Sequence, residues 1–364
     1  RGGRGVRSKN SGAYMKVAIL GTPQSGRTTL FRYLGGFGKK QDRLPPLAQV
    51  DIPDPRLDLL EKEYSAKKYT TPEFELHDTV GDFDNDGRTL EPVSPADAVI
   101  WQFRGFDQGF GPVDPASDYE LLKSVVLEKD TAILEKRLEN VDRSIKRGAK
   151  GDDKKKYEQE KAWIERMIAH MKEEKSLRTL DLDEAGRNIV RNFGLISAKP
   201  ALIHISCDED NFARREELLG AMRQRADETK NIGFAASMPI FELELEELSD
   251  EDKEIFREDA GLVESSKDTV IRGVFDASAM HVFLTAGEKE VRAWLIPRGA
   301  TALEAAGAIH SDIAQGFIRA ETLGWADYME HGSYKSAKEN AKVRLEGKEY
   351  VIKDGDIILF RFNV

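Results

Sequence analysis

The sequence has little of what marks a disulfide-bonded, zinc-stabilised or membrane-bound protein. Its 364 residues include a single cysteine, Cys207, which excludes a disulfide framework and a zinc site built from several cysteines. The six histidines are scattered and show no metal-ligand spacing. No apolar run approaches the roughly 18 residues of a membrane span, and no hydrophobic segment near the start is typical of a signal peptide. These absences predict a soluble, cytoplasmic protein with no membrane partner.

The chain also lacks an excess of positive charge. Lys and Arg total 55 against 65 Asp and Glu, giving a formal net charge of −10, which argues against nucleic-acid binding over the whole surface but allows a local basic patch. The length exceeds what one hydrophobic core usually organises, so two or three domains are expected. Residues 1–14 are rich in Gly, Arg and Ser. We interpret them as a tag or a disordered tail, with an RNA-binding arm as the alternative.

A phosphate-binding loop is predicted near the start. The short apolar run KVAIL ends at Gly21, and the following residues fit the pattern G-x-x-x-x-G-K-[ST], with Arg27 in place of the lysine. Such a loop turns backbone N–H groups toward phosphate oxygens and ends at a helix N-terminus, whose dipole favours anions. A simple strand–turn–helix is the alternative. The candidate phosphate-binding residues are Thr22, Pro23, Gln24, Ser25, Gly26, Arg27, Thr28 and Thr29.

A second element follows at a suitable distance. The run FELHDTVG ends in the pattern D-x-x-G; in P-loop NTPases the carboxylate acts on Mg²⁺ and the glycine contacts the γ-phosphate. Asp78 and the Thr28 hydroxyl are therefore the candidate Mg²⁺ ligands, and Gly81 joins the phosphate contacts. Two more buried-strand runs, AVIWQF at 98–103 and PALIHI at 200–205, are separated by helical segments. Alternating strands and helices predict a mostly parallel sheet with ligands at the strand C-termini.

A helical hairpin is predicted to interrupt this sheet. Between about 118 and 175 the chain is charged and free of proline, and apolar residues recur at spacings of three, four and seven on both sides of a turn at 148–151. The tip carries seven basic residues: Arg143, Lys146, Arg147, Lys150, Lys154, Lys155 and Lys156. A solvated coiled coil is one interpretation, and a basic prong that touches RNA or a ribosome is the other.

Residues 277–364 predict a small α+β module. Apolar and polar positions alternate in runs such as VRAWLI and IILFRF, and Asp354-Gly355 is a turn signal before the last strand. The segment ALEAAGAIH reads as one amphipathic helix. Together these features indicate a β-grasp-like fold.

These residues resemble the YchF, or Obg-like, family of P-loop ATPases. The resemblance rests on GTPQSGRTTLF, on IPDPRL at 52–57, on TTPEF at 70–74, on LEKRL before the charged hairpin, and above all on the C-terminal blocks FLTAGEKEVRAW, AAGAIHSD, GFIRAE and FRFNV. It implies a P-loop NTPase domain at 15–117 and 176–276, a coiled-coil insertion at 118–175, and a TGS domain at 277–364. It also implies Mg²⁺ with ATP or GTP as cofactor, and a TGS domain that contacts RNA or the ribosome. The candidate contacts there are Arg292, Arg319, Lys348 and Arg361, and the alternative is that each is an ordinary surface charge.

The sequence departs from the family pattern at four places. Arg27 replaces the loop lysine, and a planar guanidinium does not replace a compact ammonium freely. The segment 41–47 is short and lacks the family's threonine. Asp82 follows the D-x-x-G glycine where the family has a hydrophobic residue, and a carboxylate there repels a γ-phosphate. Finally, Ser206 stands where the family has asparagine in Asn-x-x-Glu, while Glu209 remains.

The last departure bears on the choice of base. The guanine-binding pattern Asn-Lys-x-Asp is absent from the sequence, and the family's altered motif favours adenine, so ATP is favoured over GTP. Ser206 and Glu209 are the candidate base-binding residues, with Ser237 in a loop expected to back the base.

The first three departures also predict slow or absent hydrolysis, because each removes stabilisation of transition-state charge worth about 3–4 kcal/mol. Arg27 and Asp82 are the candidate catalytic residues. We therefore expect a divergent YchF-like nucleotide-binding protein that contacts the ribosome or RNA. The alternative is a pseudo-NTPase scaffold that presents the hairpin and the TGS domain to a protein or RNA partner.

Overall fold

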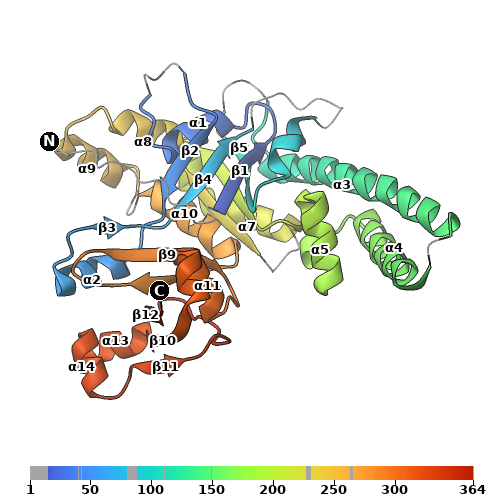
Figure 1. The fold of residues 1–364 in the computed structure, drawn as a ribbon. Helices are drawn as coiled ribbons and strands as arrows, with labels where there is room; N and C mark the ends of the chain where they lie inside the picture. The colour runs from blue at the N-terminus through green and yellow to red at the C-terminus, as the bar shows by residue number, and fades with distance from the viewer. Residues whose placement is uncertain are drawn as a thin grey trace. The chain divides into compact units, whose positions relative to one another are not determined.

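The computed structural model describes residues 15–39, 41, 43–79, 88–107, 109, 111–148, 150–226, 231–262 and 265–363. The chain forms two compact units (Figure 1). The larger unit comprises Lys16–Val50 and Glu75–Ser278, and the C-terminal unit comprises mainly Asp51–Phe74 and Ala279–Val364. No helix within the described ranges is long and apolar enough to cross a membrane.

The larger unit is built on a six-stranded sheet of order β2-β4-β1-β5-β6-β7. Its strands are β1 (Met15–Gly21), β2 (Leu47–Asp51), β4 (Glu73–Asp78), β5 (Ala98–Gly105), β6 (Ala201–Cys207) and β7 (Ile232–Ser237). The strands β1, β5, β6 and β7 run parallel, with Ile19 beside Ile100 and Ile100 beside Leu202. Their carboxyl ends therefore meet at one edge of the sheet, as the alternation of strands and helices predicts.

Helices cover both faces of this sheet. The helices of this unit are α1 (Arg27–Leu34), α3 (Pro115–Lys146), α4 (Gly151–Lys172), α5 (Glu184–Phe193), α6 (Glu209–Ala213), α7 (Arg215–Ala226), α8 (Pro239–Leu245), α9 (Asp250–Asp259) and α10 (Ser266–Ala277), with short 3-10 helices at Arg88–Val93, Leu177–Thr179 and Ile196–Ala198. On one face, Tyr119 of α3 and Met222 of α7 pack with Trp101 and Ile203 in a single apolar core. On the other face, α10 packs against β5, β6 and β7.

The helices α3 and α4 form the predicted antiparallel hairpin. Leu134 and Val141 of α3 pack with Ile164 and Met171 of α4 in their own apolar cluster, which confirms the two expected stripes. The helix α3 begins earlier than residue 118, because Asp114 caps it by accepting from the Ser117 N–H and no turn signal interrupts the chain until its end. The first turns of α3 therefore belong to the sheet core, and its later turns form the hairpin.

The C-terminal unit contains a second, mixed sheet of order β11-β10-β12-β8-β9-β3. Its strands are β3 (Tyr69–Thr70), β8 (Met280–Thr285), β9 (Val291–Pro297), β10 (Phe317–Leu323), β11 (Arg344–Glu346) and β12 (Ile357–Phe362), and its helices are α2 (Pro55–Tyr64), α11 (Ala302–Ile309), α12 (Ser311–Gln315), α13 (Trp325–His331) and α14 (Tyr334–Glu339). The predicted amphipathic helix is α11, which starts with a capping box between Thr301 and Glu304. Its alanines pack with Phe283 and Phe360 to form the core.

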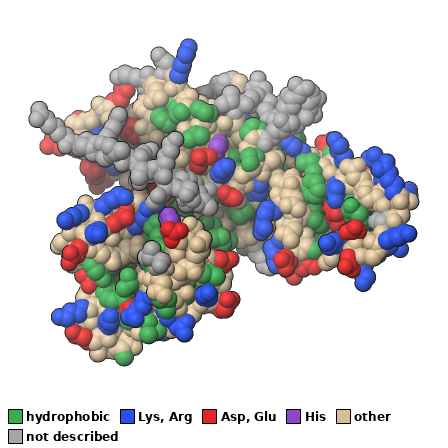
Figure 2. All heavy atoms as spheres, in the orientation of Figure 1, with side chains coloured by type: hydrophobic (Ala, Val, Ile, Leu, Met, Phe, Trp, Pro, Cys, Tyr) green, Lys and Arg blue, Asp and Glu red, His purple; other side chains and the backbone are tan. Residues whose placement is uncertain are grey.

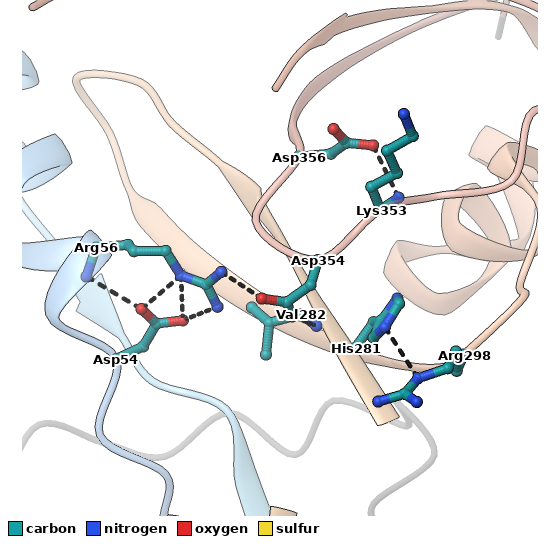
Figure 3. Close-up of polar contacts among 8 residues, drawn as sticks. All are labelled: Asp54, Arg56, His281, Val282, Arg298, Lys353, Asp354 and Asp356. Carbon is teal, nitrogen blue, oxygen red and sulfur yellow. Dashed lines mark hydrogen bonds and ion pairs between the residues drawn. The ribbon is translucent and has the colours of Figure 1, made fainter. Parts of the chain in front are cut away.

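Residues 51–74 pack within the C-terminal unit, whereas the sequence analysis placed them in the nucleotide-binding domain. The strand β3 pairs in parallel with β9, with Tyr69 beside Val291. Arg56 adds a polar link: its guanidinium binds both carboxylate oxygens of Asp54 at 2.8 and 2.7 Å and reaches Asp354 at 2.6 Å (Figure 3). These contacts join segments about 220 to 300 residues apart in sequence, which no local pattern reveals.

Candidate nucleotide-binding site

The predicted phosphate loop connects β1 to α1 at the carboxyl edge of the sheet. Gly26 has φ of 89° and precedes α1 directly, with no side chain capping the first turn. That left-handed conformation favours glycine, and it leaves the first N–H groups of α1 open to an anion. Gly21 starts the loop beside β5, where a Cβ atom would lie 2.4 Å from the Gln102 carbonyl oxygen. The loop therefore has the backbone that phosphate binding requires.

The two candidate metal ligands meet next to this loop. The Thr28 hydroxyl of α1 donates to Asp78 Oδ2 of β4 at 2.9 Å. Arg27 Nη1 donates to the Thr79 carbonyl at 2.9 Å and to Thr79 Oγ1 at 3.3 Å. The Thr79 hydroxyl in turn donates to the Ile19 carbonyl of β1 at 2.5 Å. These hydrogen bonds hold the first turn of α1 against the end of β4.

The oxygen atoms at this corner fit a magnesium ion. Asp78 Oδ1 is buried and has no hydrogen-bond partner among the described residues. Burial raises the pKa of Asp78, whereas the Thr28 hydrogen bond and the Arg27 charge lower it, and the net shift is upward. A hard cation is coordinated by carboxylate and hydroxyl oxygens and would stabilise the ionised form of Asp78. Thr28 and Asp78 are therefore the residues that would hold Mg²⁺.

A pocket of about 470 Å³ opens beside the loop. It is lined by Gln24, Gly26, Thr29, Phe106, Asp107, Ser206, Cys207, Asp208, Glu209, Pro239, Ile240, Phe241 and Glu244. Three of these residues come from the phosphate loop and the start of α1. The ends of β5 and β6 and the helix α8 supply the remainder, including the apolar walls Phe106, Ile240 and Phe241. The volume and the mixed lining suit a small ligand with a flat apolar part.

The structure brings some of the predicted residues together and separates others. Ser206 and Glu209 line the same pocket as the loop residues. Ser237 does not line it but is fully buried, where its hydroxyl contacts His204. Pro23 is exposed and Thr22 is buried. The predicted sites at Gly81 and Asp82 lie outside the described residues.

Two residues of the site, Gln102 and His204, were missed by the sequence analysis. Gln102 Nε2 donates to the Ser25 carbonyl of the loop at 2.8 Å and to Ser206 Oγ at 2.8 Å. Its amide oxygen lies 2.5 Å from His204 Nδ1, and His204 Nε2 lies 2.8 Å from Ser237 Oγ. The sequence carried one signal for them, because each lies as a polar residue within an apolar strand run. A fully buried polar side chain needs a hydrogen-bond partner, so the two could have been expected to contact other polar groups.

Complete burial makes His204 a neutral residue. Desolvation lowers the pKa of its imidazole to about 3, because the surroundings disfavour the charged form. At neutral pH the ring therefore donates one hydrogen bond and accepts another.

The basic residues at the hairpin tip lie at the surface. All seven are exposed, and Figure 2 shows Lys and Arg side chains over the outer end of α3 and α4. Arg143 contacts Asn140, and Lys154 lies 3.6 Å from Glu158. In the parts of the chain that the structure describes, the other five form no ion pair: Lys146, Arg147, Lys150, Lys155 and Lys156. The tip thus presents a cationic surface.

The cations of the C-terminal unit are less available. Arg361 pairs with Glu321, whose side chain is buried. Arg292 lies over the ring of Trp294, 3.8 Å from its centroid. Arg319 and Lys348 remain exposed.

Comparison with known proteins places the fold in context. The family model YchF-GTPase_C, described as "Protein of unknown function (DUF933)", matches residues 280–363. The chain is 32% identical to "Ribosome-binding ATPase YchF" of Bacillus subtilis, covering 96% of this chain and 100% of the relative. It is 31% identical to the protein of the same name from Escherichia coli O157:H7, over 96% and 99% of the two chains. Its structure is similar to that of the Schizosaccharomyces pombe YchF GTPase, with a TM-score of 0.82, 25% identity and coverage of 98% and 100%. This likeness confirms the predicted fold class of a P-loop domain with a helical insertion and a C-terminal TGS domain.

Proposed function

The chain belongs to the YchF family, and from that premise we propose that it binds a nucleoside triphosphate with Mg²⁺ and contacts the ribosome. The observation that carries the nucleotide half is the single pocket that joins the phosphate loop to Ser206 and Glu209. Phosphates lie against Gly26 and the first turn of α1, and the base lies between the apolar walls at the other end. The names of the two bacterial relatives support the ribosome half.

ATP is the favoured nucleotide. The sequence lacks the Asn-Lys-x-Asp pattern for guanine, and Ser206 and Glu209 supply a hydroxyl and a carboxylate at the base end of the pocket. Ser237 supports the base end from behind, through its contact with His204.

Hydrolysis is slow, with water as the nucleophile. When bound, Mg²⁺ neutralises phosphate charge beside Thr28 and Asp78. Arg27 supplies the nearby protein cation, but its guanidinium also holds the Thr79 carbonyl. The loop has no lysine, the segment 41–47 has no threonine, and Asp82 adds a negative charge. Each such loss of charge stabilisation typically costs about 3–4 kcal/mol in the transition state.

The ribosome contact uses the hairpin tip and the C-terminal unit. The seven exposed cations at the tip suit a phosphate backbone, because Lys and Arg release counterions from RNA when they bind. The exposed Arg319 and Lys348 extend the candidate contacts to the C-terminal unit.

A pseudo-NTPase scaffold is the second candidate function. It is favoured by the contacts of Arg27 with Thr79, which direct the replacement cation toward β4. In that case the hairpin and the C-terminal unit bind their partner whatever the state of the pocket.

Two variants separate the candidates. ATP turnover that requires Mg²⁺ and disappears in Thr28→Ala supports the enzyme hypothesis. Thr28 is exposed and contacts Asp78, so this variant should remove a metal ligand without disturbing the hydrophobic core. Gly26→Asp should block phosphate binding, because the φ of 89° strains any residue with a side chain and the added carboxylate repels phosphate. Two results together would contradict the nucleotide proposal and support the scaffold. They are a wild type that binds no nucleotide and a Gly26→Asp variant whose co-sedimentation with ribosomes is unchanged.

A further inference from the structure

A buried chain of four polar side chains crosses three neighbouring strands of the larger unit. Gln102 of β5 lies beside His204 of β6, and Ser206 of β6 lies beside Ser237 of β7. Side chains alternate along a strand, and directly paired residues point the same way, so all four lie on one face of the sheet. Gln102, His204 and Ser237 are fully buried, and Ser206 is 4% exposed where it lines the pocket.

Two backbone carbonyls fix the orientation of the Gln102 amide. Its Nε2 atom lies 2.8 Å from the Ser25 carbonyl oxygen and 3.0 Å from that of Phe103. A carbonyl oxygen cannot accept a hydrogen bond from another, so the amide nitrogen must face this side. The same nitrogen reaches Ser206 Oγ at 2.8 Å, so its two hydrogens serve three acceptors and one of them is shared between two oxygens. One amide group therefore contacts both the phosphate loop and the pocket wall.

The direction of the remaining hydrogen bonds follows from this orientation. The Gln102 amide oxygen can only accept, so the proton of the His204 ring lies on Nδ1, 2.5 Å away. A neutral ring has one N–H, and its Nε2 therefore accepts from the Ser237 hydroxyl at 2.8 Å. Ser237 therefore donates to His204, His204 donates to Gln102, and Gln102 donates to Ser25 and Ser206.

This direction determines what Ser206 can offer to a ligand. Its oxygen accepts a hydrogen from Gln102, and its own proton has no acceptor among the described residues. Because Ser206 lines the pocket, that proton is available to a bound molecule. Adenine and guanine share one acceptor on the edge that carries the imidazole ring, the nitrogen N7.

We propose that Gln102 is a positioning residue that ties the phosphate loop to the base end of the pocket and makes Ser206 a hydrogen-bond donor to purine N7. The inference rests on the proposed function, because it assigns the base end of the same pocket. Gln102 touches no ligand; it acts through the Ser25 carbonyl and the Ser206 hydroxyl.

The test compares ATP with 7-deaza-ATP, which lacks only the N7 acceptor, by calorimetry. The wild type should bind ATP about tenfold more tightly than 7-deaza-ATP, the effect of one hydrogen bond. In Ser206→Ala and in Gln102→Met this ratio should fall to about one. Gln102→Met should also weaken both nucleotides, because the Ser25 carbonyl loses its partner, and the double variant should show no further change in the ratio.

Trp101→Phe is the matched control. Trp101 precedes Gln102 in β5 but packs on the opposite face of the sheet, so this variant should keep the wild-type affinity and ratio. If the wild type binds ATP and 7-deaza-ATP equally well, this inference is overturned but the proposed function is not. The same holds if Gln102→Met keeps the wild-type affinity and ratio. If Gln102→Met does not fold, an unchanged ratio in Ser206→Ala overturns it. A wild type that binds neither nucleotide overturns the proposed function and this inference together.

Discussion

The side-chain amide of Gln102 donates a 2.8 Å hydrogen bond to the backbone carbonyl of Ser25, 77 residues earlier in the chain. The phosphate loop is therefore held by the interior of the sheet as well as by its own turn. A loop held in this way keeps its N–H groups in place before a ligand arrives, which reduces the ordering cost of binding.

The residue in the lysine position of the loop should limit affinity. Arg27→Lys replaces a planar guanidinium, now bonded to the Thr79 carbonyl, with a compact ammonium that suits phosphate oxygens. We expect ATP affinity to rise by about tenfold, or roughly 1.4 kcal/mol. Calorimetry of the wild type, Arg27→Lys and the uncharged control Arg27→Met measures the change. Equal affinity of the Lys and Met variants would show that position 27 does not contact phosphate.

Acid should weaken the larger unit through His204. Burial lowers the pKa of this ring to about 3, so below pH ~6.5 the unfolded chain binds a proton that the folded chain does not. The contribution of neutral His204 to the free energy of unfolding is thus fully present above pH ~6.5. It is lost as the pH falls toward 3, by about 1.4 kcal/mol per pH unit. Between pH 7.5 and 5.5 the wild type should lose about 1.4 kcal/mol more unfolding free energy than His204→Gln, whose side chain does not titrate.

Denaturant titrations at the two pH values give this difference. An equal loss in both proteins would mean that His204 takes up a proton in the folded state, which would contradict its assignment as a neutral link in the polar chain.

The hairpin tip should carry a salt-dependent part of the ribosome contact. Reversing three exposed cations on α4, Lys154→Glu, Lys155→Glu and Lys156→Glu, should weaken co-sedimentation with ribosomes on the order of tenfold and flatten its dependence on salt. The control reverses three exposed lysines away from the tip: Lys136→Glu, Lys172→Glu and Lys175→Glu. If both triple variants lose the same affinity, the effect is one of net charge and the tip has no special role.

The ion pairs of Arg56 should stabilise the attachment of residues 51–74 within the C-terminal unit. The side chain of Arg56 is 18% exposed and that of its partner Asp54 only 6%, so removing the guanidinium leaves a buried carboxylate without its ion-pair partner. We expect Arg56→Ala to lower the local stability by about 3 kcal/mol. Hydrogen exchange of the α2 amides measures it directly. The more exposed pair of Lys68 and Glu290 is the control, and Lys68→Ala should cost less than about 1 kcal/mol. Similar exchange in both variants would contradict a structural role for Arg56.

Local patterns in the sequence predicted much of this molecule. The spacing of Gly21 and Gly26 gave the phosphate loop, because each glycine meets a local requirement of the backbone. The apolar stripes gave the hairpin, because α3 and α4 pack on each other with little help from the rest of the chain.

The sequence did not reveal features that depend on distant partners. The pairing of β3 with β9 joins Tyr69 to Val291, and nothing near Tyr69 identifies that partner. The polar chain was missed for a related reason. Gln102 and His204 stand in apolar runs that identify their strands as buried, and only the register of β5 against β6 places the two side chains together.

The most direct test of the nucleotide-binding site is a calorimetric titration of the purified chain with ATP and with GTP, each with and without Mg²⁺. The account predicts saturable binding of ATP with a Kd on the order of micromolar, tighter with Mg²⁺ than without it, and weaker binding of GTP. A folded protein that binds neither nucleotide under any of these conditions would contradict it.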